Sequence, residues 1–145
     1  MDQGVPAVID ERGLLVASDL ARIARQPAAP AAKLAEALEL LFRAYGSGDP
    51  DFSGLMLRGW IAAREDKHCR LRLAWQREQL RLSLEDILTE GVASGAVKAG
   101  LDPGAVAALI VGAAEAALLQ APTDGGSVTA DDLARALLAL VLSGA

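Results

Sequence analysis

The amino-acid composition predicts an all-α protein. Of the 145 residues, 52% are hydrophobic but only 3% are aromatic, and the apolar residues are mostly Ala, Leu and Val. Ala and Leu favour helices, whereas strands favour β-branched and aromatic residues. Apolar residues also recur at helical spacing along much of the chain. The length suits one domain, so we expect an antiparallel bundle of about five to six helices.

Proline and glycine divide the chain into these helices. Residues 1–13 are expected to be irregular because they include two glycines and a proline. Pro27 and Pro30 end the first helix, since proline lacks the amide donor and clashes inside a helix. Gly46 follows the second helix, and Asp51 or Ser53 is expected to cap the third. The expected helices cover about residues 14–25, 31–45, 51–65, 71–95, 103–120 and 130–143.

A glycine-rich stretch at residues 90–112 raises the alternative of a phosphate-binding loop. That loop needs Gly, four residues and then Gly-Lys-Ser/Thr after a strand. Here Lys98 is followed by Ala99, and a helical pattern precedes the glycines. Asp102 stands at an N-cap position and Pro103 at the first helical position. The stretch is therefore expected to be a turn between two helices.

The last two expected helices are apolar nearly all round. Between Ala105 and Ala121 the only charged residue is Glu115, and "LARALLALVL" follows a cap at Thr129. A helix that is apolar on every side must be covered on every side. We therefore expect a homodimer in which these two helices of each subunit form a four-helix interface. A membrane-spanning hairpin is the weaker alternative. The residues expected at the dimer interface are Leu109, Gly112, Ala113, Ala116, Leu119, Leu133, Ala136, Leu137 and Leu140.

No constellation of residues indicates catalysis, a cofactor or a metal site. The single His68 and the single Cys69 are adjacent, so their side chains point about 100° apart on a helix, and no other His or Cys completes a zinc set. One cysteine makes no internal disulfide, and the N-terminus lacks the pattern of a signal peptide. We expect a cytoplasmic protein that is not an enzyme and needs no cofactor.

The charge distribution argues against direct binding of nucleic acid by this chain. The net charge is −5 and the pI is about 4.8, whereas nucleic-acid binding needs a cationic face. Residues 58–81 nevertheless hold seven basic and three acidic residues, a net charge of +4. The other seven basic and sixteen acidic residues give −9. This basic segment is interpreted either as a solvated helix face or as a face for an acidic ligand or a neighbouring domain.

The two tryptophans suggest a small-molecule pocket on the middle helices. Such pockets are mostly apolar with a few polar anchors and often lie between bundle helices. The alternative is that these aromatic residues belong to the core. The candidate pocket residues are Phe42, Met56, Trp60, Arg64, His68, Trp75 and Gln79, with Gln76 as a further polar anchor.

The segment "AWQREQLRLSLEDILTEGVASGAVKAGLDPGAVAALIVGAAEAALLQA" resembles the C-terminal half of TetR-family transcriptional regulators. In that family a long helix ends in a glycine-containing turn, Asp-Pro opens the next helix, and an apolar helix with a small-residue centre follows. The resemblance covers about residues 31–145. It implies an effector-binding and dimerisation domain, with a small apolar or amphipathic effector between the middle helices and the last two helices at the dimer interface.

The first 30 residues depart from that family. TetR regulators begin with a helix-turn-helix domain that reads the major groove, and no intact one stands here. Residues 10–25 resemble either part of its pattern or the helix that links the two halves. DNA contact is expected only through a helix-turn-helix domain outside these residues, and a separate effector domain, a misplaced start and a natural remnant all stay open. The alternative function is a homodimeric helical adaptor that binds neither ligand nor DNA.

Overall fold

The protein is an all-helical bundle. The computed structural model describes residues 4–47, 49–120 and 128–144, and within them the only strand-like pairing is one isolated bridge. The predicted fold class is confirmed. The helices of the described residues are α1 (Gly4–Arg25), α2 (Pro30–Tyr45), α3 (Pro50–Ala63), α4 (Lys67–Ser94), α5 (Pro103–Gln120) and α6 (Ala130–Val141).

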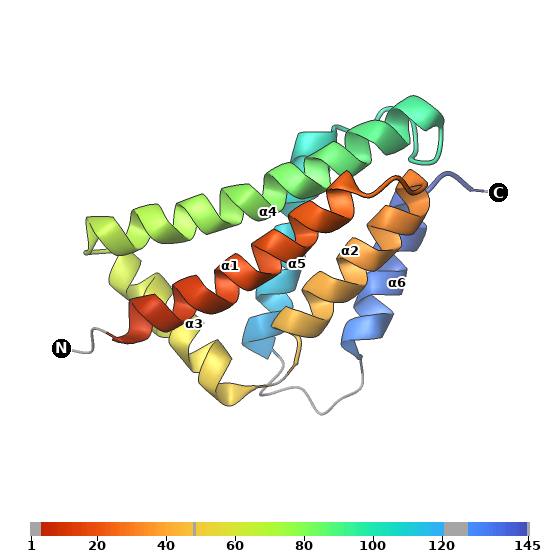
Figure 1. Ribbon diagram of the computed structural model, residues 1–145. Coiled ribbons are helices and arrows are strands. Elements are labelled where there is room, and N and C mark those ends of the chain that lie inside the picture. Colours follow the sequence, from red (N-terminus) through yellow and green to blue (C-terminus); the bar gives the residue numbers. More distant parts are fainter. Residues whose placement is uncertain (1–3, 48, 121–127, 145) are drawn as a thin grey trace.

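Helices α2 and α4 hold the bundle together: α2 packs on α1, α4, α5 and α6, and α4 packs on α1, α2, α3 and α5. Figure 1 shows α1 between α2 and α4, with α3 at the end of the bundle where α1 and α4 begin. Helix α5 packs mainly on α4, and α6 packs mainly on α2. The largest fully buried side chains are Phe42, Leu20, Ile23, Leu34, Leu38, Leu41, Leu84, Ile87, Leu88, Ile110 and Leu118.

The N-terminal segment corrects one expectation. Helix α1 begins at Gly4, so residues 4–13 are helical rather than irregular. Pro6 falls in the first turn, where proline is tolerated. Gly13 lies where α1 approaches α4 so closely that a Cβ atom there would collide with the side-chain amide of Gln76. This glycine permits a close contact between two helices and does not break the first one.

The starts of α3 and α4 also differ from expectation. Helix α3 begins at Pro50 and is capped by Asp49, whose carboxylate accepts a hydrogen bond from the Asp51 amide at 3.0 Å. The expected caps Asp51 and Ser53 were therefore wrong. Helix α4 begins at Lys67, four residues earlier than expected, because Asp66 caps it.

Three other predicted helix boundaries, at Gly95, Asp102-Pro103 and Thr129, are confirmed, whereas α3 and α6 each end two residues earlier than expected. Gly95 ends α4 in the left-handed conformation, with φ of 83°. The Asp102 carboxylate accepts from the Gly104 amide at 3.1 Å, and Pro103 opens α5. Thr129 and Asp132 form a reciprocal capping box at the start of α6.

The end of the chain pairs with the turn between α4 and α5. The Lys98 amide donates to the Val141 carbonyl at 3.0 Å, and the Ser143 amide donates to the Ala96 carbonyl at 2.9 Å. The Ser143 hydroxyl donates to the Gly95 carbonyl at 2.8 Å. Helix α6 is thus held at its C-terminal end by backbone hydrogen bonds as well as by packing on α2.

Candidate functional site

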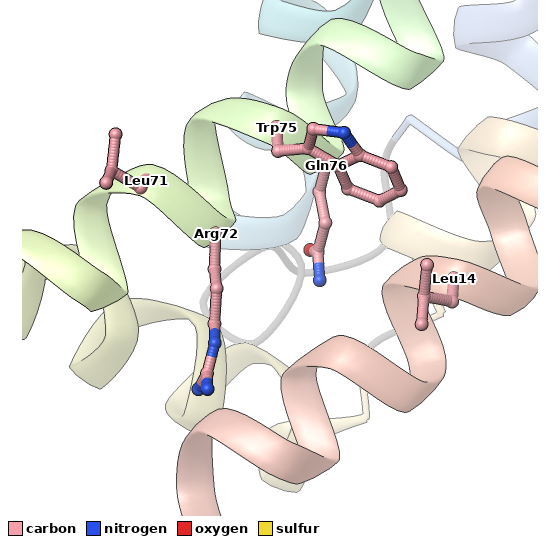
Figure 2. Close-up of a pocket in the computed structure, with 5 residues that line it drawn as sticks. All are labelled: Leu14, Leu71, Arg72, Trp75 and Gln76. Carbon is pink, nitrogen blue, oxygen red and sulfur yellow. The ribbon is translucent and has the colours of Figure 1, made fainter.

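A pocket of about 400 Å³ lies between α1 and α4. Figure 2 shows Arg72 and Gln76 extending from α4 toward α1, which contributes Leu14. Leu14, Leu71 and Trp75 are exposed, and Trp75 keeps 54% of its surface accessible. Gln76 is buried against Gly13. The spacing of residues 71, 72, 75 and 76 places them on neighbouring turns of α4.

The chemistry of this pocket suits an amphipathic molecule. Leucine and tryptophan surfaces supply apolar contact, while the Arg72 guanidinium is permanently charged and binds planar anions well. Arg64, Lys67 and Arg70 are exposed at the corner where α3 meets α4. The basic segment found in the sequence therefore lies next to an open apolar pocket.

The structure separates the candidate pocket residues predicted from the sequence. Phe42 and Met56 are buried in the core, whereas Arg64 and His68 are exposed at the α3–α4 corner. Gln79 is half-buried on α4. Trp75 and Gln76 line the α1–α4 pocket, which also contains Leu14, Leu71 and Arg72, three residues that the sequence had not singled out. Trp60 lines a different pocket.

The second pocket lies between α3, α4 and α5 and measures about 440 Å³. Arg77 and Glu115 line it and form a two-point ion pair, in which Arg77 Nε donates to Glu115 Oε2 at 2.8 Å and Nη2 donates to Oε1 at 2.9 Å. The Glu115 side chain is only 16% exposed. The lining residues are Trp60, Arg77, Gly112, Glu115, Ala116 and Leu119.

Tyr45 is buried close to this ion pair. The pKa of its hydroxyl is raised to about 12, mainly by burial and also by the Glu115 carboxylate, while Arg77 opposes the change. The Tyr45 ring meets Phe52 edge to face at 5.9 Å between centroids.

Arg12 of α1 lies 4.4 Å above the Phe52 ring and pairs with Asp49 at 3.1 Å. The hydrogen bond from Arg12 lowers the pKa of Asp49. This cluster joins α1 to the α2–α3 turn.

A buried lysine joins three helices. Lys33 of α2 has 4% of its side chain exposed, and its Nζ donates to the Ala24 carbonyl of α1 at 3.0 Å and to Glu90 of α4 at 2.8 Å. Glu90 itself is half exposed. An unpaired ammonium would be costly at this depth, so the two acceptors allow Lys33 to fix the C-terminal end of α1. The sequence did not indicate this role, because its two acceptors lie on other helices.

The residues predicted for a dimer interface lie on α5 and α6. Leu109, Ala116 and Leu119 of α5 are exposed, and Leu109 keeps 70% of its surface accessible. Gly112, Ala113, Leu133 and Leu137 are half-buried, while Ala136 and Leu140 are exposed. The monomer therefore leaves apolar side chains exposed on α5 and, separately, on α6.

Helix α5 is also long and apolar enough to cross a membrane, judged by length and composition alone. Core helices of soluble proteins meet the same criterion, and a third of α5 is buried inside the bundle. Among the described residues, no group of three or more His, Cys, Asp and Glu side chains is placed to hold a metal ion.

Comparison with known proteins identifies a similar fold but not a family. No family model and no curated protein matches this sequence. The chain is similar to the crystal structure of a transcriptional regulator, FadR from Bacillus subtilis, in complex with stearoyl-CoA. The TM-score is 0.72 at 20% sequence identity, over 97% of this chain and 74% of that one. At this identity the likeness shows the all-helical fold.

Proposed function

We propose that this chain is the effector-binding and dimerisation domain of a TetR-like transcriptional regulator. The observation that carries the proposal is the α1–α4 pocket, with Trp75 and two leucines beside the Arg72 guanidinium. The TetR-like order of elements in residues 74–121 supports it, as does the structural likeness to a regulator. We place the protein in the cytoplasm as a homodimer without enzymatic activity, contacting DNA only through a helix-turn-helix domain outside the residues seen here.

The effector in this proposal is a small amphipathic molecule. Its apolar part contacts Leu14, Leu71 and Trp75, and an anionic group meets Arg72. FadR was crystallised with stearoyl-CoA, which has a long apolar chain and a phosphate-bearing head. A molecule of that chemistry is therefore the first probe for the pocket.

The regulatory step would be a change in the position of α1 relative to α4. The pocket lies between these helices. A ligand that fills it therefore favours an arrangement in which the distance between α1 and α4 matches the size of the ligand. A ligand shifts the equilibrium only as far as it binds one arrangement better than the other. In a dimer, that shift would alter the spacing of attached DNA-binding domains.

Fluorescence titration tests the pocket. Trp60→Phe leaves Trp75 as the only indole, so we expect stearoyl-CoA, kept below its micelle concentration, to change the emission saturably. CoA alone and a neutral long-chain alcohol alone should bind more weakly, because each offers only one of the two contacts. Trp75→Phe, which keeps the indole of Trp60, is the matched control and should show a much smaller change. No saturable change in either variant would refute an acyl-CoA-like effector.

Arg72→Gln separates the two parts of the proposed site. We expect roughly a tenfold loss of affinity for stearoyl-CoA, since a charge-assisted contact to the head is removed, but little change for a neutral long-chain alcohol. Equal loss for both probes would mean that Arg72 shapes the pocket and does not bind the anion.

A homodimeric adaptor with no ligand is the second candidate. It is favoured by Phe42 and Met56, which fill the interior where an enclosed cavity was expected. A stable dimer that binds no amphipathic probe at any concentration below its micelle threshold would support the adaptor over the regulator.

A further inference from the structure

The exposed side of α5 has an open position at its centre. A Cβ atom built at Gly112 meets nothing within 4 Å. The only glycines with positive φ in the described residues are Gly95 and Gly100, so Gly112 is not required by the backbone. Glycine also costs a helix about 1 kcal/mol relative to alanine. The packing of one subunit therefore gives no reason for a glycine here.

Gly112 lies between a protruding side chain and a hollow. Leu109, one turn earlier, is the most exposed large apolar residue of the described chain. Ala116, one turn later, lines the pocket that Trp60 and Leu119 border, and Gly112 lines it too. Residues spaced by three and four share a helix face. The protruding Leu109 side chain and the pocket beside Ala116 thus lie on the same face of α5, on either side of Gly112.

We infer that two copies of the chain pack with their α5 helices crossing in antiparallel fashion at Gly112, so that Leu109 of each copy enters the partner's pocket beside Trp60. In a two-fold interface the same patch meets itself. Counting three residues in opposite directions from Gly112 sets residue 109 of one copy opposite residue 115 of the other, next to residue 116. This inference rests on the dimer in the proposed function and adds its register and contacts.

The polar groups of the pocket are compatible with this packing. Arg77 and Glu115 are already joined by two hydrogen bonds within one subunit. Covering a paired charge costs less than covering an unpaired one. Leu109 of the second copy would contact the Trp60 ring and Ala116 in the pocket. Because Gly112 has no side chain, the two α5 backbones can approach closely.

Site-directed crosslinking tests the register. In a Cys69→Ala background, Gly112→Cys should form a disulfide-linked dimer on mild oxidation, because the two Cα atoms must come within about 7 Å for a disulfide. Ala105→Cys should not link to itself, since seven residues from the crossing point place two such residues on the order of 20 Å apart. Ala105→Cys mixed with Leu119→Cys should crosslink, because an antiparallel crossing sets these positions opposite each other.

Dimer dissociation, measured by sedimentation equilibrium, tests the contact. We expect Leu109→Ala to raise the dissociation constant roughly tenfold or more, because two buried leucines are lost per dimer. Leu15→Ala is the matched control, since Leu15 is 63% exposed on α1 and lies away from this face. Gly112→Ala should weaken the dimer as well, although in an isolated helix it is stabilising.

The outcomes separate the register from the dimer itself. A dimer that crosslinks best through Ala105→Cys alone or Leu119→Cys alone, or that tolerates Leu109→Ala, overturns the register and leaves the proposed function standing. A monomer at all concentrations overturns both. A monomer that sediments with phosphatidylcholine–phosphatidylglycerol vesicles also overturns both, and assigns the α5 face to a lipid surface.

Discussion

The ionisation of Tyr45 offers a direct measurement of the buried environment beside the Arg77–Glu115 pair. Its pKa is raised to about 12, first by burial and then by the Glu115 carboxylate. The value in an unfolded chain is about 10. A pKa that is higher by about two in the folded state corresponds to roughly 3 kcal/mol, at about 1.4 kcal/mol for each unit of pH.

The sign follows from the proton count. Above pH 10 the unfolded chain loses the phenolic proton while the folded protein keeps it. The stabilisation is therefore fully present below pH 10 and is lost progressively as the pH rises toward 12. We expect the free energy of unfolding to fall by roughly 3 kcal/mol across that range because of Tyr45 alone.

Tyr45 is the only tyrosine, so its ionisation can be followed by absorbance near 295 nm without interference from another phenol. The midpoint in the native protein should lie near pH 12 or coincide with alkaline unfolding, monitored by circular dichroism. In concentrated urea it should lie near pH 10. Tyr45→Phe should remove the signal and flatten the fall in urea stability relative to wild type. A native midpoint near pH 10 in a protein that is still folded would refute the reasoning.

Three further substitutions, one of them a control, test the packing of α1 and of the α4–α5 turn. Lys33→Met keeps the aliphatic length but removes the hydrogen bonds to the last turn of α1 and to Glu90, so urea denaturation should show a loss of about 1–3 kcal/mol; an unchanged midpoint would mean that this lysine fixes nothing. Gly91→Ala would place a Cβ atom against the Val97 side chain, and we expect a loss of about 1–3 kcal/mol in the same assay. Gly54→Ala, in an open part of α3, should instead stabilise by about 0.5–1 kcal/mol, and equal effects at both glycines would contradict the packing described.

The parts of the fold that the sequence predicted well depend on local chemistry. Asp102-Pro103 and Thr129 marked helix starts because capping involves only a few consecutive residues. Periodic leucines marked α2 and α4 because helix faces repeat over short distances. The glycine at position 13 was misread, since its role depends on Gln76, which is distant in the sequence and close only after folding.

The candidate site was harder to predict for the same reason. Trp60 and Trp75 are 15 positions apart and both lie on middle helices, but they line different pockets. Which face of a helix meets which neighbour is set by helix packing, and composition does not report it. Leu14 was part of a short predicted helix, and only the path of α1 along α4 brings it to the pocket.

The hydrogen bonds between the end of the chain and the α4–α5 turn have a consequence for folding. Ser143 and Gly95 are 48 positions apart, and their contact closes a loop that contains all of α5 and α6. Closing a long loop costs entropy that grows only with the logarithm of its length, so this contact is compatible with late formation. Opening it releases the C-terminal end of α6, whereas α5 stays packed on α4. The amides in the last turn of α6 should therefore exchange with solvent before those of α5, so the two helices would open separately.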